Sequence, residues 1–177
     1  MLVARGLIDQ PDLDSARRFL HEVRHASGIN YMLADPSGVE DYECSRDQVH
    51  RFQPPGNGRH IAHTNHPLAS TDRLDPEMFS TETRWLHEHS NEHSTHRMNC
   101  LENTFLIEGG AVDVDGIKQV LSSHDPPQFP ICRHKQAVLD PMSGMTNNSL
   151  VMVMNRPAEM QLASGPPCIS EFKTFEF

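Results

Sequence analysis

The sequence has 177 residues and a mass of 20.0 kDa, the size of one ordinary domain, which we expect to span residues 1–177. Hydrophobic residues make up 37% and charged residues 22%, and the formal net charge of −9 argues against binding to nucleic-acid phosphates, which needs clustered Lys and Arg. The longest apolar run, residues 150–154, is too short to span a membrane, and the N-terminus lacks the apolar core of a signal peptide, so we predict a cytoplasmic protein.

The first predicted elements are a helix and a meander of short strands. Apolar residues recur at helical spacing over residues 14–27, where Asp14 or Ser15 can cap the start and Gly28 can follow the end. A hairpin is predicted across the turn Asp35–Gly38, and two further strands complete one sheet. The four strands are expected at residues 29–33, 39–44, 48–52 and 59–64, with another turn at 54–58.

The middle of the chain predicts helices. Ser80 can cap a helix that carries Trp85, and a second helix is expected from about residue 94 to 107, where Gly109 and Gly110 follow it. These two helices are predicted as separate elements.

A third short helix and a return to strands are predicted in the last third of the chain. Asp113 or Asp115 can cap this helix. The final strands are expected at residues 150–155, 159–163 and 169–177. Strands, then helices, then strands indicate a layered α/β or α+β sandwich.

The twelve histidines raise the question of a metal site. His89 and His93 would lie on one face of a helix, with His96 nearby, and such a pair can hold zinc through two imidazoles. The sequence has no HExxH motif and no evident third ligand, so a solvated, His-rich helical surface is the simpler interpretation. No metal and no cofactor is therefore assigned.

A series of short sequence blocks follows in a fixed order. In that order and spacing the blocks resemble the C-terminal part of the acyl-coenzyme A:6-aminopenicillanic acid acyltransferase family, which belongs with the choloylglycine hydrolases among the cysteine N-terminal-nucleophile hydrolases. The hairpin that starts at Gly28 is similar as well, so the resemblance covers the chain from about residue 15 onward. The blocks are His63–His66, Ser94–Arg97, Leu121–Asp125, Ile131–His134 and Gly165–Cys168, with Thr146 and Arg156 among the last strands.

The resemblance implies a fold and a reaction. Such enzymes are four-layer αββα sandwiches, made as precursors that cut themselves and expose a cysteine as the new N-terminal residue. The thiol attacks an amide or thioester carbonyl while the free α-amino group acts as the base, and the acyl-enzyme passes its acyl group to water or to an amine.

Five residues are the site candidates that the resemblance implies. Asn65 maps to a donor of the oxyanion hole and Arg97 to an arginine near the nucleophile, where a positive charge favours the thiolate. Ser94 would orient that arginine or line the substrate pocket, and Thr64 and His66 flank Asn65 as substrate-binding candidates. Two simpler interpretations stay open: Asn65 as a turn residue that ends a strand, and Arg97 as a surface arginine of a helix.

The nucleophile of the family has no counterpart among the four cysteines, which form no CxxC pair and are predicted to be free thiols. The cysteine and the N-terminal strands would have to lie upstream of these residues, so the sandwich is expected to be incomplete. The sequence would then be a truncated part or a subunit of an acyltransferase or linear-amide hydrolase, or an enzyme that has lost catalysis. Half a sandwich exposes sheet edges and an apolar face, so a homodimer or hetero-complex is predicted.

Two alternatives remain. One is a catalytically inactive, His-rich binding module that keeps the fold and can bind metal. The other is that one of the existing cysteines, Cys44, Cys100, Cys132 or Cys168, has taken over as the nucleophile.

Overall fold

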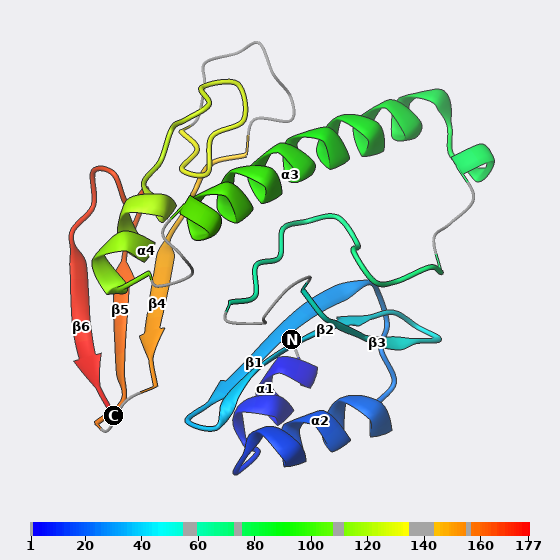
Figure 1. Ribbon diagram of the computed structural model, residues 1–177. Helices are drawn as coiled ribbons and strands as arrows, with labels where there is room; N and C mark the ends of the chain where they lie inside the picture. Colours follow the sequence, from blue (N-terminus) through cyan, green and yellow to red (C-terminus); the bar gives the residue numbers. More distant parts are fainter. Residues whose placement is uncertain (1, 55–59, 73–75, 108–111, 135–143, 155–156) are drawn as a thin grey trace. The chain divides into compact units, whose positions relative to one another are not determined.

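The computed structural model describes the whole chain except residues 1, 55–59, 73–75, 108–111, 135–143 and 155–156. It divides into two compact units, one formed by residues 1–61 and 67–78 and the other by residues 62–66 and 79–177. The described residues form four α-helices and two antiparallel sheets of three strands (Figure 1). The mixed α/β composition is confirmed, and the prediction of one domain stays a prediction.

The first unit pairs two short helices with a meander sheet. Helix α1 spans Leu2–Ile8 and was not predicted from the sequence. Helix α2 follows it and packs against the first strand (Figure 1). The remaining elements are α2 (Leu13–Glu22), β1 (Ile29–Asp35), β2 (Gly38–Cys44), β3 (Val49–Phe52) and the 3-10 turn η1 (Pro76–Met78).

Helix α2 is shorter than the predicted helix over residues 14–27. Its cap is Asp12, whose carboxylate accepts from the Ser15 amide at 2.7 Å. The helix ends at Glu22, because Val23 takes an extended conformation, and a ring nitrogen of His25 lies 2.9 Å from the Leu20 carbonyl oxygen. The prediction was wrong at both ends, because side-chain contacts at these ends decide where the helix begins and stops.

The sheet of the first unit confirms the predicted hairpin. Strands β1 and β2 pair in the register that sets Asp35 opposite Gly38, and β3 pairs with β2. Leu20 of α2 and Tyr42 and Cys44 of β2 are buried as the core of this unit. The prediction of a fourth strand at residues 59–64 was wrong where the structure describes them, because residues 60–64 form no strand. Residue 59 and the turn predicted around 54–58 fall largely outside the described residues.

The second unit combines a long helix, a short helix and a second meander sheet. Helix α3 is one continuous element over Thr81–Ile107, so the prediction of two helices there was wrong. The predicted cap is confirmed, since the Ser80 hydroxyl accepts from the Thr83 amide at 3.2 Å. Gly109 and Gly110, predicted to stop this helix, lie outside the described residues.

Helix α4 spans Val114–Leu121 and packs on strand β4 (Figure 1). Asp113 is its cap and accepts from the Gly116 amide at 2.8 Å, as one of the two predicted alternatives. Three C-terminal strands are confirmed and pair in the order β4-β5-β6. Their bounds are β4 (Ser149–Val153), β5 (Glu159–Ala163) and β6 (Phe172–Glu176). The prediction that the last strand begins at residue 169 was wrong, because the amides of Ile169 and Ser170 close a turn on the Pro166 carbonyl oxygen.

Among the helices formed by described residues, none has the length and hydrophobicity needed to cross a bilayer.

Candidate functional site

The segment of residues 62–66 lies against helix α3 through one buried serine. Ser94 is completely buried, and its hydroxyl oxygen accepts from the Asn65 amide at 2.6 Å. The same hydroxyl lies 2.9 Å from Nδ1 of His66 and 3.0 Å from the Thr64 hydroxyl. Thr64 in turn donates to the Ser94 carbonyl oxygen at 3.0 Å. Four sequence candidates therefore meet in one network, and it fixes the backbone on both sides of Asn65.

The fifth candidate, Arg97, lies one helical turn beyond Ser94 and contacts the Asn65 side chain. Its Nη2 donates to Asn65 Oδ1 at 3.0 Å. Because a guanidinium is only a donor, the amide atom that faces it must be the oxygen. The Asn65 amide nitrogen is thereby directed away from Arg97, and Asn65 itself is exposed. The arrangement leaves the neutral NH2 group of Asn65, which has two N–H donors, facing away from Arg97.

The surroundings of Arg97 include a second positive charge. Burial lowers the pKa of Arg97, and the nearby Arg133 guanidinium lowers it further. Among the described residues, the Arg97 Nε atom is buried and has no hydrogen-bond partner. A buried donor without a partner is rare, and it marks a place where an anionic or carbonyl oxygen would be stabilised.

The position of Arg133 depends on hydrogen bonds between its backbone and Thr146 and on the absence of a side chain at Gly144. Its amide donates to the Thr146 hydroxyl and its carbonyl accepts from the Thr146 amide, both at 2.9 Å. Its guanidinium packs over Gly144, where a Cβ atom would stand 2.5 Å from Nη2. A larger residue at position 144 would push this cation away from its place in the second unit.

Ser94 cannot serve as the nucleophile, even though a histidine nitrogen lies within hydrogen-bond distance. Its side chain is completely buried, and its oxygen already accepts from the Asn65 amide. The observed contacts of Ser94 are with Asn65 and His66. The two predicted roles of Ser94, orienting Arg97 or lining the substrate pocket, stay predictions.

The cysteines of the described residues are all free, as predicted. Cys44 belongs to the core of the first unit, and burial raises its pKa to about 11. Cys100 lies on α3, with Sγ 3.5 Å from the Asp125 carbonyl oxygen. Cys132 and Cys168 face each other with their sulfur atoms 3.5 Å apart. Among the described residues, no cysteine takes part in the hydrogen bonds of Asn65 and Arg97.

The histidines of α3 contact aromatic rings. His89 packs on Trp85 with ring centroids 4.0 Å apart, and His96 stacks on Phe129 at 3.9 Å. His93 meets the edge of the same Phe129 ring at 4.8 Å. In the part of the chain that the structure describes, these histidines join no group of three or more metal-ligating side chains.

One group of metal-ligating side chains does occur among the described residues, and it was not predicted from the sequence. The ligand atoms of His124, Cys132, His134 and Cys168 all lie within 4.8 Å of one another. These residues show no metal-ligand spacing in the sequence, because 34 or more positions separate Cys168 from the other three. The short Cys-x-His pattern at residues 132–134 was the only local signal.

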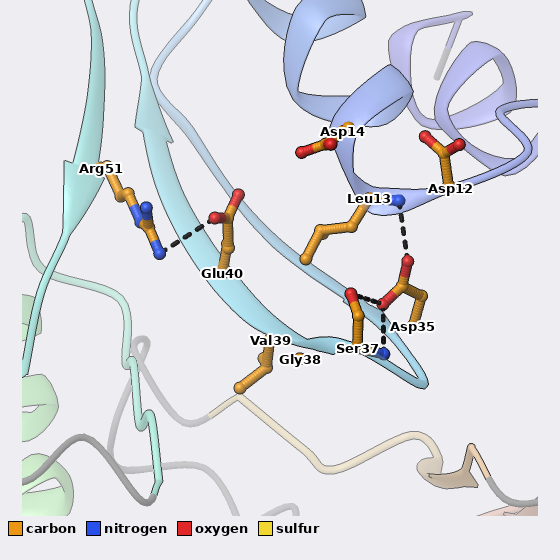
Figure 2. A pocket seen from close by; sticks show the side chains of 9 residues that line it. All are labelled: Asp12, Leu13, Asp14, Asp35, Ser37, Gly38, Val39, Glu40 and Arg51. Carbon is orange, nitrogen blue, oxygen red and sulfur yellow. Dashed lines mark hydrogen bonds and ion pairs between the residues drawn. The ribbon is translucent and has the colours of Figure 1, made fainter.

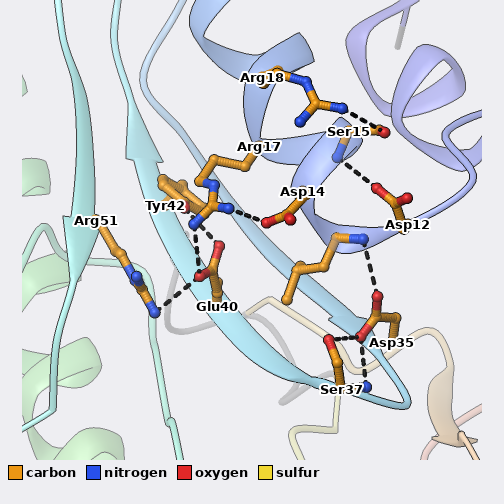
Figure 3. Close-up of polar contacts among 11 residues, drawn as sticks. Asp12, Asp14, Ser15, Arg17, Arg18, Asp35, Ser37, Glu40, Tyr42 and Arg51 are labelled. Carbon is orange, nitrogen blue, oxygen red and sulfur yellow. Dashed lines mark hydrogen bonds and ion pairs between the residues drawn. The ribbon is translucent and has the colours of Figure 1, made fainter.

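The first unit has a hollow of about 580 Å³ beside the start of α2 (Figure 2). Its lining includes four carboxylates, each already engaged within the unit (Figure 3). Asp12 caps α2, Asp14 pairs with Arg17, and Asp35 accepts from the Leu13 amide at 3.0 Å. Glu40 pairs with Arg51 at 2.9 Å and accepts from the Tyr42 hydroxyl at 2.7 Å. The carboxylates that line this hollow therefore serve to hold α2 against the β1–β2 hairpin.

The chain matches no protein-family model and no curated protein. The resemblance to the acyltransferase family thus stays a prediction from its residue blocks.

Proposed function

We propose that Asn65 and Arg97 form the oxyanion-binding part of an acyl-transfer site, in a cysteine acyltransferase or linear-amide hydrolase. The observation that carries the proposal is the 3.0 Å hydrogen bond from Arg97 Nη2 to Asn65 Oδ1. This bond fixes which end of the amide faces outward, so that Nδ2 is the donor offered to the substrate oxygen. A preorganised donor of this kind stabilises charge that develops in the transition state.

The reaction that these residues would support is a two-step acyl transfer. A cysteine thiolate attacks the carbonyl carbon of an amide or thioester, and the carbonyl oxygen becomes an oxyanion that accepts from Asn65 Nδ2. The oxyanion collapses, the carbon–nitrogen or carbon–sulfur bond breaks, and the leaving group takes a proton. Water or an amine then attacks the thioester and releases the acyl group. The positive charges of Arg97 and Arg133 favour the thiolate and the oxyanion.

The nucleophilic cysteine and the rest of the proposed αββα sandwich are supplied by a segment or chain beyond these 177 residues, where the cysteine is exposed by self-cleavage. Thr64, His66 and Ser94 are then positioning residues, because they hold the backbone at Asn65. In this proposal the native protein acts as a homodimer or hetero-complex on a small acyl-amide or acyl-thioester, without a cofactor.

The test starts from the DNA that precedes the Met1 codon, translated in frame and expressed with the chain. An extension that supplies a cysteine should give amide or thioester hydrolysis, and Asn65→Ala should lower kcat by about 10²–10³-fold. Asn65→Asp is the sharper variant, since Arg97 can pair with the new carboxylate while the N–H donor is lost. Asn99→Ala, an exposed position on α3, is the matched control and should keep full activity.

The 177-residue chain by itself should be inactive in the same assay. Hydrolysis by this chain that Asn65→Ala abolishes would contradict the proposal that the nucleophile lies beyond these 177 residues. An extended protein whose activity survives Asn65→Asp unchanged would contradict the role of Asn65.

The second candidate function is a catalytically inactive binding module that holds a metal. It is favoured by the cluster of His124, Cys132, His134 and Cys168, which has no part in the proposed reaction. Full metal occupancy in a protein that lacks acyl transfer even when extended would favour this candidate.

A further inference from the structure

Three segments of the second unit converge on one cluster of ligand atoms. His124 follows the end of α4, Cys132 and His134 lie on the segment of residues 131–134, and Cys168 lies in the turn after β5. The Nε2 atom of His134 is 3.0 Å from Nε2 of His124 and 3.0 Å from Sγ of Cys168. The sulfur atoms of Cys132 and Cys168 are 3.5 Å apart.

Hydrogen bonds alone do not satisfy this arrangement. A neutral imidazole nitrogen has either one hydrogen or one lone pair, yet His134 Nε2 faces two atoms at the same distance. A cation at the centre accepts a lone pair from all four groups at once. Bond lengths of ~2.0–2.1 Å to nitrogen and ~2.3 Å to sulfur place neighbouring tetrahedral ligands roughly 3.3–3.8 Å apart. Three pairs of ligand atoms here are 3.0, 3.0 and 3.5 Å apart, and all four atoms lie within 4.8 Å of one another.

We infer that His124, Cys132, His134 and Cys168 form a tetrahedral site for a zinc ion. Two thiolates and two imidazoles are a donor set that selects zinc among the common divalent ions, while magnesium and calcium prefer oxygen ligands. Four protein ligands leave no open position for substrate, so the ion is structural. The site is separate from the proposed acyl-transfer residues and does not rest on that function.

The surrounding backbone holds the ligands before any metal binds. The Cys132 amide donates to the Ser123 carbonyl oxygen at 2.9 Å, which places residue 132 beside the segment that leads to His124. The turn at Cys168 is closed by the amides of Ile169 and Ser170, which both donate to the Pro166 carbonyl oxygen, at 3.1 and 3.0 Å. Preformed geometry of this kind lowers the cost of ordering the ligands around the ion.

Burial divides the site into an inner and an outer side. Cys132 is completely buried and Cys168 partly so, whereas His124 and His134 are exposed. The ion can therefore enter from solvent past the imidazoles and reach the thiolates. Once bound, it joins the end of α4 to the turn after β5, and it fixes the backbone on both sides of Arg133.

The first experiment measures metal in the full chain, purified without a histidine tag under reducing conditions with zinc in the growth medium. We expect about one zinc per chain after exhaustive buffer exchange. Cobalt(II) added to the metal-free protein should give the near-ultraviolet thiolate charge-transfer band and the intense visible bands of a tetrahedral site. Removal of the metal with a chelator should lower the melting temperature, because the ion binds only the folded chain.

Substitutions identify the ligands. Cys132→Ser and Cys168→Ser should each weaken metal binding by more than the ~10–100-fold that loss of an outer-shell partner costs. Cys100→Ser and His89→Gln are the matched controls on α3, and both should bind one zinc as tightly as the wild-type chain.

A labelling experiment needs no variant and therefore does not depend on how well the substituted chains fold. Zinc should protect the partly exposed Cys168 from alkylation while Cys100 reacts at the same rate with and without zinc, as mapped by mass spectrometry. Zinc-free wild-type protein, equal alkylation with and without zinc, or a Cys132–Cys168 disulfide that persists under reducing conditions would overturn the inference.

Discussion

At the scale of single residues, Ser94 does most to build the proposed acyl-transfer site. It lies on α3 and is small enough to be completely buried beneath the segment of residues 62–66, where its one hydroxyl contacts Asn65, Thr64 and His66. A buried hydroxyl with several partners is costly to remove, because those partners are then left in an environment without water.

We predict that Ser94→Ala destabilises the second unit by about 1–3 kcal/mol, the usual penalty for leaving buried polar groups without partners. Urea unfolding followed by circular dichroism measures this change. Ser90→Ala is the control, because Ser90 is exposed on the same helix and alanine favours helix there. Equal stability of the two variants would show that the Ser94 network contributes nothing.

The residue blocks assigned Asn65 and Arg97 to one expected site, but they predicted no contact between the two residues. Thirty-two positions separate the two residues, and the sequence contains no signal for which atoms would touch. The four residues of the proposed zinc site were missed for a related reason. Ligand spacing is visible in sequence only when the ligands lie on one local motif, and these four residues come from three separate segments.

At the scale of elements, sequence patterns predicted the ends of helices and strands best where neighbouring residues determine those ends. The hairpin around Asp35 and the cap of α4 at Asp113 follow from turn and capping residues, and both are confirmed. The predicted strand over residues 59–64 was wrong where the structure describes it, because the polar groups of Thr64 and Asn65 bond to Ser94 instead of a neighbouring strand. Such long-range partners are invisible in an apolar-polar pattern.

Helix α4 should depend on its cap, since Asp113 satisfies an amide of the first turn that has no partner within the helix. We predict that Asp113→Ala destabilises the second unit by about 1 kcal/mol. Asp115→Ala removes an exposed carboxylate that pairs with Lys118 at 3.6 Å, and it should cost only a few tenths of a kcal/mol. Chemical unfolding of both variants measures the difference, and equal losses would contradict a capping role for Asp113.

The contact that Asp35 makes between α2 and the β1–β2 hairpin should weaken at low pH. Hydrogen bonds from Ser37 and from the Leu13 amide hold the pKa of Asp35 below its ordinary value of 3.8. Since the folded state favours the charged form, this contribution is present above pH 3.8 and is lost as the pH falls through the lowered pKa.

Asp35→Asn should therefore destabilise the first unit at neutral pH, and the difference from the wild-type chain should shrink as the pH drops below 3.8. Unfolding followed across pH 2–7 measures this. Asp47→Asn alters a carboxylate that is 77% exposed, and we expect a stability curve parallel to that of the wild-type chain. A destabilisation by Asp35→Asn that stays constant across the acid range would contradict the assignment.

At the scale of the whole molecule, the second sheet presents apolar side chains on one face. Strand register places Met152, Met160 and Phe175 in one row across β4, β5 and β6. Met152 is 59% exposed and Phe175 44%, while Ser149 and Val151 of β4 point to the buried side. Contiguous apolar side chains on a sheet are typical of a surface that another chain covers.

In the proposed sandwich, the sheet from the nucleophile-bearing segment covers this face, and without that segment the face should associate with a second copy of the chain. We predict that the 177-residue chain sediments as a dimer or larger species at micromolar concentration. Met152→Lys should shift it toward monomer, because it places a charge in the apolar row at its most exposed methionine. Met78→Lys, on an isolated methionine of the first unit that is 77% exposed, should leave the association unchanged. A stable monomer at micromolar concentration would contradict the predicted association, since the apolar row would then be stable in water without a covering chain.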